Sequence, residues 1–384
     1  MKIQRSLIII VLCILNFMVS LVAHSYELIN SNGNHFHVNG YLNNVSYKSK
    51  DKSQIKNYSF IHYNLKAKTK ILGKLKGFGL WDQKIKILNK RSENDHDITK
   101  NNTIGFAGFS LKNIGSIDYG RNYGIMHDVS VLTNVAPIFG GESIISDNFF
   151  SGPSNGLTTY RNKDFFGMVK GLNFAIQHQN ESDQHNNQGE IRDSHGEGYG
   201  VSTSYDFGQG LYAAIAYSNS ELTESQIDLI KTNLHHEHDH NKKRSISYAI
   251  GLKYKKNNLF LSTLLSDNQY MTPFGSFKKG YIYNEHDIHG ISDKYRNIEV
   301  FAKYKFDCGI NPSIGYLQSK MSYDNGVSQV YTRKFISIGA DVILNKKILT
   351  YMNYKLNILP ENNFARNINV SVDNVLSVGI IYNL

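Results

Sequence analysis

The chain has 384 residues and a formal net charge of +10, with 42 Lys and Arg against 32 Asp and Glu. Its 25 Tyr, 20 Phe and 31 Gly, set against only 5 Pro, are typical of many strands joined by turns. A basic excess can indicate a nucleic-acid partner, but the basic residues here are spread along the chain, so we expect no nucleic-acid partner.

The first 25 residues are predicted to be a secretory signal peptide. Lys2 and Arg5 precede an uncharged run that ends at Ala23, and a second small residue stands at Ser25. A positive start, an apolar stretch and a small-x-small site are the marks of such a peptide. The alternative is an uncleaved membrane anchor, because the run is nearly long enough to span a bilayer. We expect cleavage after Ser25, which leaves residues 26–384.

The two cysteines exclude a disulfide framework. Cleavage removes Cys13 and leaves Cys308 alone, so no internal disulfide can form. We expect Cys308 to pack as a small apolar residue and to have no reactive role.

Four stretches alternate between apolar and small or polar residues. They run from Leu211 to Tyr217, from Ile246 to Tyr254, from Ile336 to Leu344 and from Leu376 to Leu384. A period of two predicts strands with one apolar face. In a soluble sandwich that face would be the core, but strands of about ten residues can also cross a hydrocarbon layer when tilted.

These strands are predicted to close into an outer-membrane β-barrel. We find no later segment that qualifies as a transmembrane helix, and only helices and closed barrels satisfy their backbone groups in lipid. The exported chain therefore predicts one all-β domain over residues 26–384, located in the cell outer membrane as a multi-pass β-barrel. Polar stretches such as Glu181 to Glu197 and Asn233 to Arg244 would be its long loops.

Several motifs carry a resemblance to a known family. They are FAGFSLKNIGSIDYGRNYG (106–124), PIFGGES (137–143), SDNFFSGPSNGLTTYRNKDFFGMVKGLNFAIQ (146–177), YKFDCGINPSIGY (304–316) and the closing VLSVGIIYNL. Together they resemble the general trimeric porins of Gram-negative bacteria. The resemblance spans the mature chain, although the loops between Glu181 and Asn297 align poorly. Heavy use of Asn, Lys and Ile suggests an AT-rich genome, such as that of an endosymbiont.

The resemblance implies a 16-stranded antiparallel barrel whose third loop, from about Ile125 to Gly156, folds into the lumen. It implies a water-filled channel for passive diffusion of small hydrophilic solutes and ions, with no enzymatic activity and no cofactor. It also implies a homotrimer, contact with outer-membrane lipid and insertion by the barrel-insertion machinery. Arg121 matches the family arginine that receives an acidic residue from a neighbour's second loop, and Glu93 is the candidate donor of this trimer latch. Asp118 and Arg121 are then structural or interface residues and not a catalytic pair.

The predicted constriction lacks most of the charge that is usual in the family. The two loop positions that are acidic in the family fall on Asn134 and Ile138. The four wall positions that are basic in the family fall on Tyr41, His62, Thr103 and Pro153. Relaxed selection and a new specificity explain this loss equally well. With their neighbours, the candidate constriction residues are Tyr41, His62, Lys66, Thr103, Asn134, Pro137, Ile138, Phe139, Gly140, Gly141, Glu142, Asp147, Pro153 and Arg161.

Some charge is retained near the predicted constriction. Glu142 and Asp147 follow on the loop, and Arg161 follows its return. Strand parity predicts that Ile61, Tyr63, Leu65 and Ala67 face lipid and that His62, Asn64, Lys66, Lys68 and Lys70 face the lumen. We therefore expect a weak selectivity that leans towards anions. This preference for anions should strengthen below about pH 6, as His62 protonates.

Other interpretations concern single motifs and the whole barrel. The run HHEHDH, His235 to His240, offers imidazoles for a metal, but it lacks a regular ligand spacing, so we expect a solvated loop and no metal site. A barrel protease would need acids and a histidine converging at the rim, and the family match argues against it. A non-conducting barrel that stabilises the envelope or meets host factors stays open, and stepwise conductance in a planar bilayer would exclude it.

The last residue generates a testable prediction. Family members usually end in an aromatic residue that the insertion machinery reads, whereas this chain ends Tyr382-Asn383-Leu384. We predict slow insertion by machinery tuned to a terminal Phe, so Leu384→Phe should raise the yield of surface-exposed protein in such a host. An unchanged yield, measured by surface labelling at equal expression, would show that the departure is neutral.

Overall fold

The computed structural model describes residues 26–31, 33–50, 57–87, 103–140, 150–182, 194–234, 244–275, 290–323, 328–360, 367, 370 and 372–384. Several sequence-based predictions fall outside these ranges. They concern the signal peptide over residues 1–25, Glu93, Gly141, Glu142, Asp147 and the run from His235 to His240.

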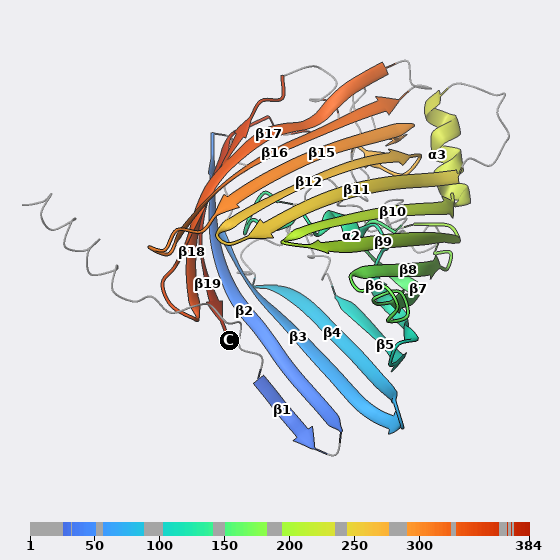
Figure 1. The fold of residues 1–384 in the computed structure, drawn as a ribbon. Coiled ribbons are helices and arrows are strands. Elements are labelled where there is room, and N and C mark those ends of the chain that lie inside the picture. The colour runs from blue at the N-terminus through green and yellow to red at the C-terminus, as the bar shows by residue number, and fades with distance from the viewer. Residues whose placement is uncertain are drawn as a thin grey trace, which may run out of the picture.

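Sixteen strands within the described ranges form a closed antiparallel ring (Figure 1). They are β2 (Asn34–Ser49), β3 (Asn57–Leu72), β4 (Leu75–Ile87), β5 (Ile104–Leu111), β6 (Gly115–Tyr123), β7 (Pro153–Asn162), β8 (Leu172–Gln179), β9 (Gly198–Gly208), β10 (Leu211–Glu221), β11 (Arg244–Lys256), β12 (Leu259–Gln269), β15 (Lys294–Tyr304), β16 (Ile310–Tyr323), β17 (Ser328–Ile343), β18 (Ile348–Asn357) and β19 (Val375–Asn383). Each strand pairs with the next, and β19 pairs with β2 from Val375↔Ser49 to Asn383↔Tyr41. The predicted 16-stranded barrel is confirmed.

Three further strands and two helices accompany the described ring. β1 (Tyr26–Ser31) pairs with the start of β2, in line with β19, and β13 (Pro273–Phe274) pairs with β14 (Gly290–Ile291). The short helix α2 (His127–Ser130) lies inside the ring, and α3 (Glu224–Leu234) follows β10 (Figure 1). Among the described helices, none is long and apolar enough to cross a membrane.

Helix α3 was missed by the sequence interpretation. The Thr223 N–H donates to Gln226 Oε1 at 3.0 Å, and the Gln226 N–H donates to Thr223 Oγ1 at 3.4 Å. This reciprocal pair is a capping box, which satisfies backbone N–H groups at the start of a helix. The sequence Thr-Glu-Ser-Gln at 223–226 is therefore the signal that marks the helix start.

The strands have their apolar residues outside and their small polar residues inside. On β19, Val378 is 48% exposed whereas its neighbour Ser377 is 0% exposed. The same contrast separates Ile338 from Ser337 on β17 and Tyr248 from Ser247 on β11. This arrangement is the reverse of a soluble core, and it suits a barrel whose outer surface meets lipid. The predicted alternation is confirmed on these strands.

Short turns and long loops lie at opposite ends of the ring. Two-residue turns join β3 to β4, β9 to β10 and β11 to β12, and in bacterial outer-membrane barrels such turns face the periplasm. Cys308 lies in the turn between β15 and β16 and is exposed. The expectation that it packs as a small apolar residue is wrong, because the chain reverses there at the rim of the wall.

Candidate functional site

The link between β6 and β7, residues 124–152, folds into the barrel and is called the inward loop below; residues 141–149 lie outside the described ranges. Its two ends are joined, since Gly124 N–H donates to the Gly152 oxygen at 2.9 Å and Met126 N–H to the Phe150 oxygen at 3.0 Å. A Cβ on Gly124 would lie 2.1 Å from the carbonyl carbon of Phe150, so this position requires glycine. The loop ends earlier than the predicted Gly156, because Pro153 already pairs with Tyr123.

Apolar side chains hold the inward loop against one wall. Ile125, Met126, Val129 and Leu132 are buried. The same cluster contains Phe150, Leu157, Ala175, Ala214, Ala216, Ala249 and Leu264. Burying a side chain of the size of Leu or Met contributes roughly 1.5–3 kcal/mol. The loop is therefore docked mainly by its own apolar face.

The wall is hollowed where α2 lies against it. A Cβ on Gly251 of β11 would lie 2.9 Å from both Leu132 Cδ1 and Val129 Cγ1. A Cβ on Gly200 of β9 would lie 2.5 Å from Ile125 Cγ2. Distances this short force a neighbour to move, so glycines at these two positions provide the space that the loop fills.

Two fully buried glutamines of β8 anchor the base of the loop. Gln177 Nε2 donates to the Tyr123 oxygen and to Thr159 Oγ1, both at 2.9 Å. Gln179 Oε1 accepts a hydrogen bond of 3.1 Å from the Phe150 N–H. Buried amides of this kind need such partners, because leaving them unpaired costs about 1–3 kcal/mol each.

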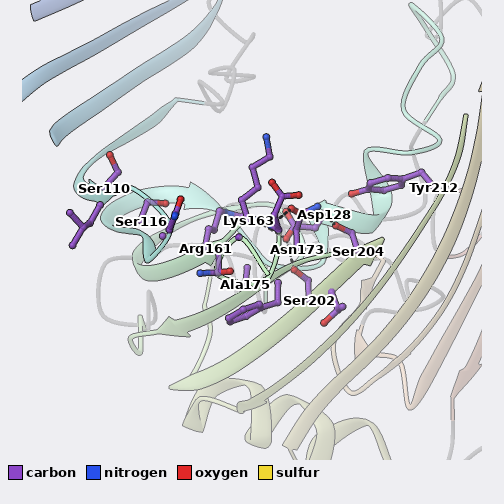
Figure 2. Close-up of a pocket in the computed structure, with 18 of the residues that line it drawn as sticks. Ser110, Ser116, Asp128, Arg161, Lys163, Asn173, Ala175, Ser202, Ser204 and Tyr212 are labelled. Atoms are coloured by element: carbon purple, nitrogen blue, oxygen red, sulfur yellow. Dashed lines mark hydrogen bonds and ion pairs between the residues drawn. The ribbon is translucent and has the colours of Figure 1, made fainter. Parts of the chain in front are cut away.

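An ion pair fastens α2 to strand β7 (Figure 2). Arg161 Nη1 on β7 lies 2.8 Å from Asp128 Oδ2, and Ser202 Oγ on β9 donates to the same oxygen at 2.5 Å. Both charged side chains keep contact with water, with 37% and 24% of their surfaces exposed. A half-exposed pair contributes little stability by itself, so its main effect is to orient the loop.

His127 occupies the first position of α2. Its ring stacks on Tyr123 with 4.0 Å between ring centroids. Burial lowers the pKa of the His127 imidazole below its ordinary value; Asp128 opposes this shift and Arg161 adds to it. Because the docked loop favours the neutral imidazole, docking weakens as the pH falls below the ordinary histidine range.

A cavity of about 650 Å³ lies beside this ion pair, towards the short turns (Figure 2). Asp128 and Arg161 line it together with Asn173, Ser202 and Ser204. Hydroxyl and amide groups can replace the hydration of a polar solute, so the cavity is suited to hold water and small hydrophilic molecules.

Asp82 of β4 is the centre of a second cluster, on the wall formed by β2, β3 and β4. His62 Nε2 lies 2.8 Å from Asp82 Oδ1, and Asn64 Nδ2 donates to Asp82 Oδ2 at 2.8 Å. The ring of Tyr41 is 4.9 Å from that of His62. Asp82 was missed by the sequence interpretation, although the two-residue turn after β3 sets its register opposite Asn64.

The far end of the inward loop reaches the wall around β17 and β18. Phe139 packs edge-on against Tyr47 of β2, with 6.3 Å between ring centroids. Lys355 Nζ lies 5.8 Å from the centre of the Phe139 ring and 4.7 Å from that of Phe335. The described part of the loop therefore contacts both the β9–β12 wall and the β17–β2 wall, which narrows the lumen between them.

Known proteins resemble this chain in sequence and in fold. Residues 31–384 match the family model described as Gram-negative porin. The chain is 35% identical to outer membrane protein S2 of Salmonella typhi over 94% of this chain and 95% of that protein. It is 36% identical to outer membrane porin C of Enterobacter cloacae subsp. cloacae, over 95% and 96%. The solved structure of Salmonella typhi OmpF in complex with daunomycin superposes with a TM-score of 0.79, at 32% identity over 93% and 99% of the two chains.

The chain belongs to the Gram-negative porin family. It is an outer-membrane porin, a channel for passive diffusion of small hydrophilic solutes and ions. The predicted family, fold class, localisation and channel function are confirmed.

The predicted constriction residues of this porin lie in several places. The structure brings Tyr41 and His62 together, with Lys66 farther along the same face of β3. Thr103 precedes β5, and its backbone oxygen accepts a 2.9 Å hydrogen bond from Arg121 Nε. Pro153 starts β7 at the base of the inward loop.

The remaining predicted positions lie on the loop or beyond it. Asn134 is exposed, and Pro137, Ile138, Phe139 and Gly140 are half-buried. Arg161 is not beside His62 but is paired with Asp128 on the short-turn side of the loop. In the described part of this porin, no group of three or more His, Cys, Asp or Glu side chains is placed to hold a metal.

Gly251→Leu tests how the inward loop is docked. The new side chain would occupy the space of Val129 and Leu132, and such overpacking costs about 1–3 kcal/mol. We expect the loop to leave its recess, which should change the single-channel conductance and increase cleavage of the loop by protease. Ile250→Leu, on the outward face of β11, is the matched control. Wild-type conductance in Gly251→Leu would contradict the docking described here.

Proposed function

We propose that this porin works as a homotrimer with a weak preference for anions and without enzymatic activity. The preference rests on one observation, the excess of lysine on a single wall of the lumen. The trimer rests on the outer surface of β2 to β6. Each is argued separately below.

The lumen-facing side of β2, β3 and β4 is strongly basic. By register with His62 and Asn64, the described lysines on this side are Lys66, Lys68, Lys70, Lys76, Lys84 and Lys86, called the lysine wall below. Asp82 is the one carboxylate at the described lumen-facing positions of these three strands, and His62 and Asn64 already bind it. A wall with this excess raises the local concentration of anions in the channel.

Two carboxylates at other described lumen-facing positions are each paired with a cation. Asp128 is paired with Arg161. Asp341 of β17 forms an ion pair with Lys303 and accepts a 2.7 Å hydrogen bond from Asn311 Nδ2. Each of these two pairs is close to neutral, so neither offsets the charge of the lysine wall.

The outer surface of β2 to β6 is apolar and carries several small side chains. Small residues alternate outward at Ala67, Gly79, Gly105 and Ala107. Larger apolar residues, among them Phe36, Leu65 and Tyr119, border shallow grooves there. Close approach of a second barrel requires such small side chains, which supports this surface as the trimer contact. Arg121 pairs with Gly105 at its edge, where the proposed latch to Glu93 of a neighbour would form.

Reversal potentials across a salt gradient test the anion preference. We expect Lys66→Ala to shift the potential towards cations and Asp82→Asn to shift it towards anions. Lys48→Ala, on the outward face of β2, should leave the potential unchanged. A clear wild-type cation preference would overturn the proposal.

Gly105→Phe tests the trimer contact. An added Cβ meets nothing within 4 Å in the single barrel, so the fold should tolerate the ring. In a trimer the ring would prevent close approach, and light scattering in mild detergent should show more monomer than in the wild type. A wild type that is monomeric throughout, or a Gly105→Phe variant that forms trimers equally well, would contradict the proposed contact.

A further inference from the structure

Aromatic rings line the lumen beside the lysine wall. Tyr41 of β2 lies opposite His62 of β3, with 4.9 Å between the ring centroids. Phe60, two residues before His62 on the same face, meets the Tyr41 ring edge-on at 6.0 Å between centroids. Phe60 is buried, whereas Tyr41 is half-buried. The Tyr41 ring is therefore held by two neighbours and keeps part of its surface towards the channel.

A second tyrosine reaches this region from the base of the inward loop. Tyr123 is the last residue of β6, and its ring stacks on that of His127 in α2. Tyr123 is close enough to Tyr41 and Asp82 to interact electrostatically with both. The two tyrosines therefore flank the same part of the lumen, one from the wall and one from the inward loop.

Ammonium groups begin beside these rings and continue along the wall. Lys84 of β4 lies opposite His62, and its Nζ is 3.8 Å from the centre of the Phe60 ring. The lysines farther along the same face of β3, about 7 Å apart, are Lys66, Lys68 and Lys70. All four lysine side chains are exposed. An anion in the lumen can therefore reach several of them.

Asp82 places hydrogen-bond acceptors between the rings and Lys66. Its two oxygens are contacted by His62 Nε2 and Asn64 Nδ2, one each, at 2.8 Å. A carboxylate oxygen can accept more than one hydrogen bond, so Asp82 can also accept from an N–H group of a solute. Successive inward positions of this wall therefore offer an aromatic ring, an acceptor for N–H groups and a row of cations.

From this arrangement we propose that the lumen holds a binding site for nucleoside phosphates, in which the base stacks on Tyr41 and the phosphates lie among the ammonium groups of the lysine wall. Bases of any kind stack on aromatic side chains. A base with an amino group can also donate to Asp82. Lysine binds phosphate as a point charge. The inference rests on the anion preference proposed above and adds a class of solute to it.

Block of the ion current in planar bilayers tests the site. The probes are ADP, which carries both a base and phosphates, pyrophosphate, which lacks the base, and adenosine, which lacks the charge, all in magnesium-free buffer. ADP should reach half-block at a concentration about tenfold below that of pyrophosphate, the gain that stacking on one ring can give. Adenosine should be weaker than ADP.

The outcomes separate this site from the anion preference. An anion-selective channel that ADP blocks no better than pyrophosphate, or that adenosine blocks as well as ADP, would overturn the nucleotide site alone. A cation-selective channel would overturn the anion preference as well.

Tyr41→Leu tests whether the ring supplies the stacking surface. The ratio of pyrophosphate to ADP half-block concentrations should fall from about ten towards one, whereas Tyr41→Phe, which keeps the ring, should retain it. Lys66→Ala should weaken block by both phosphates and leave their ratio near the wild-type value. Tyr354→Leu, on the lipid-facing side of β18, is the matched control and should change neither. Only inserted, conducting channels are scored, so misfolded protein does not enter the comparison. A wild-type ratio in Tyr41→Leu would overturn the site.

Discussion

Every backbone group that faces lipid must find its hydrogen-bond partner within the protein, and the rest of the structure depends on this constraint. The pairing of β19 with β2 removes the last open edge of the sheet, so no strand of the described ring is left half-bonded. Closure then divides the side chains into two sets, and the apolar set must face outward. The inward-facing positions between them carry small polar residues, such as Ser377 and Ser247.

The inward loop narrows the channel although the loop has no hydrophobic core of its own. Its apolar residues use space that glycine and alanine leave on the β9–β12 wall, and Asp128 of α2 bonds to β7 and β9. The loop therefore buries most of its apolar side chains at this contact. The proposed anion selectivity rests instead on β2, β3 and β4, where the lysine wall and Asp82 lie.

The fold was predictable because alternation with a period of two is a local property that each strand carries by itself. The site was less predictable because it depends on register between strands. Tyr41 and His62 were expected near each other, but Asp82 emerges only when β4 is aligned with β3. Arg161 was expected at the constriction, yet its partner Asp128 lies on a loop whose path no strand pattern reveals. Cys308 was misplaced because motif matching does not report exposure in a turn.

The strand beside β2 is composed of both ends of the described chain, β19 for most of its length and β1 for the rest. At this seam Tyr351 Oη donates to Asn43 Oδ1 at 2.9 Å, across 308 positions of sequence. Bringing together such distant segments is the costliest loop closure in the barrel, so the seam should form last during folding and control its rate. An intermediate with the hairpins paired but the seam open would still expose two strand edges. Factors that assist assembly would need to protect these edges until they pair.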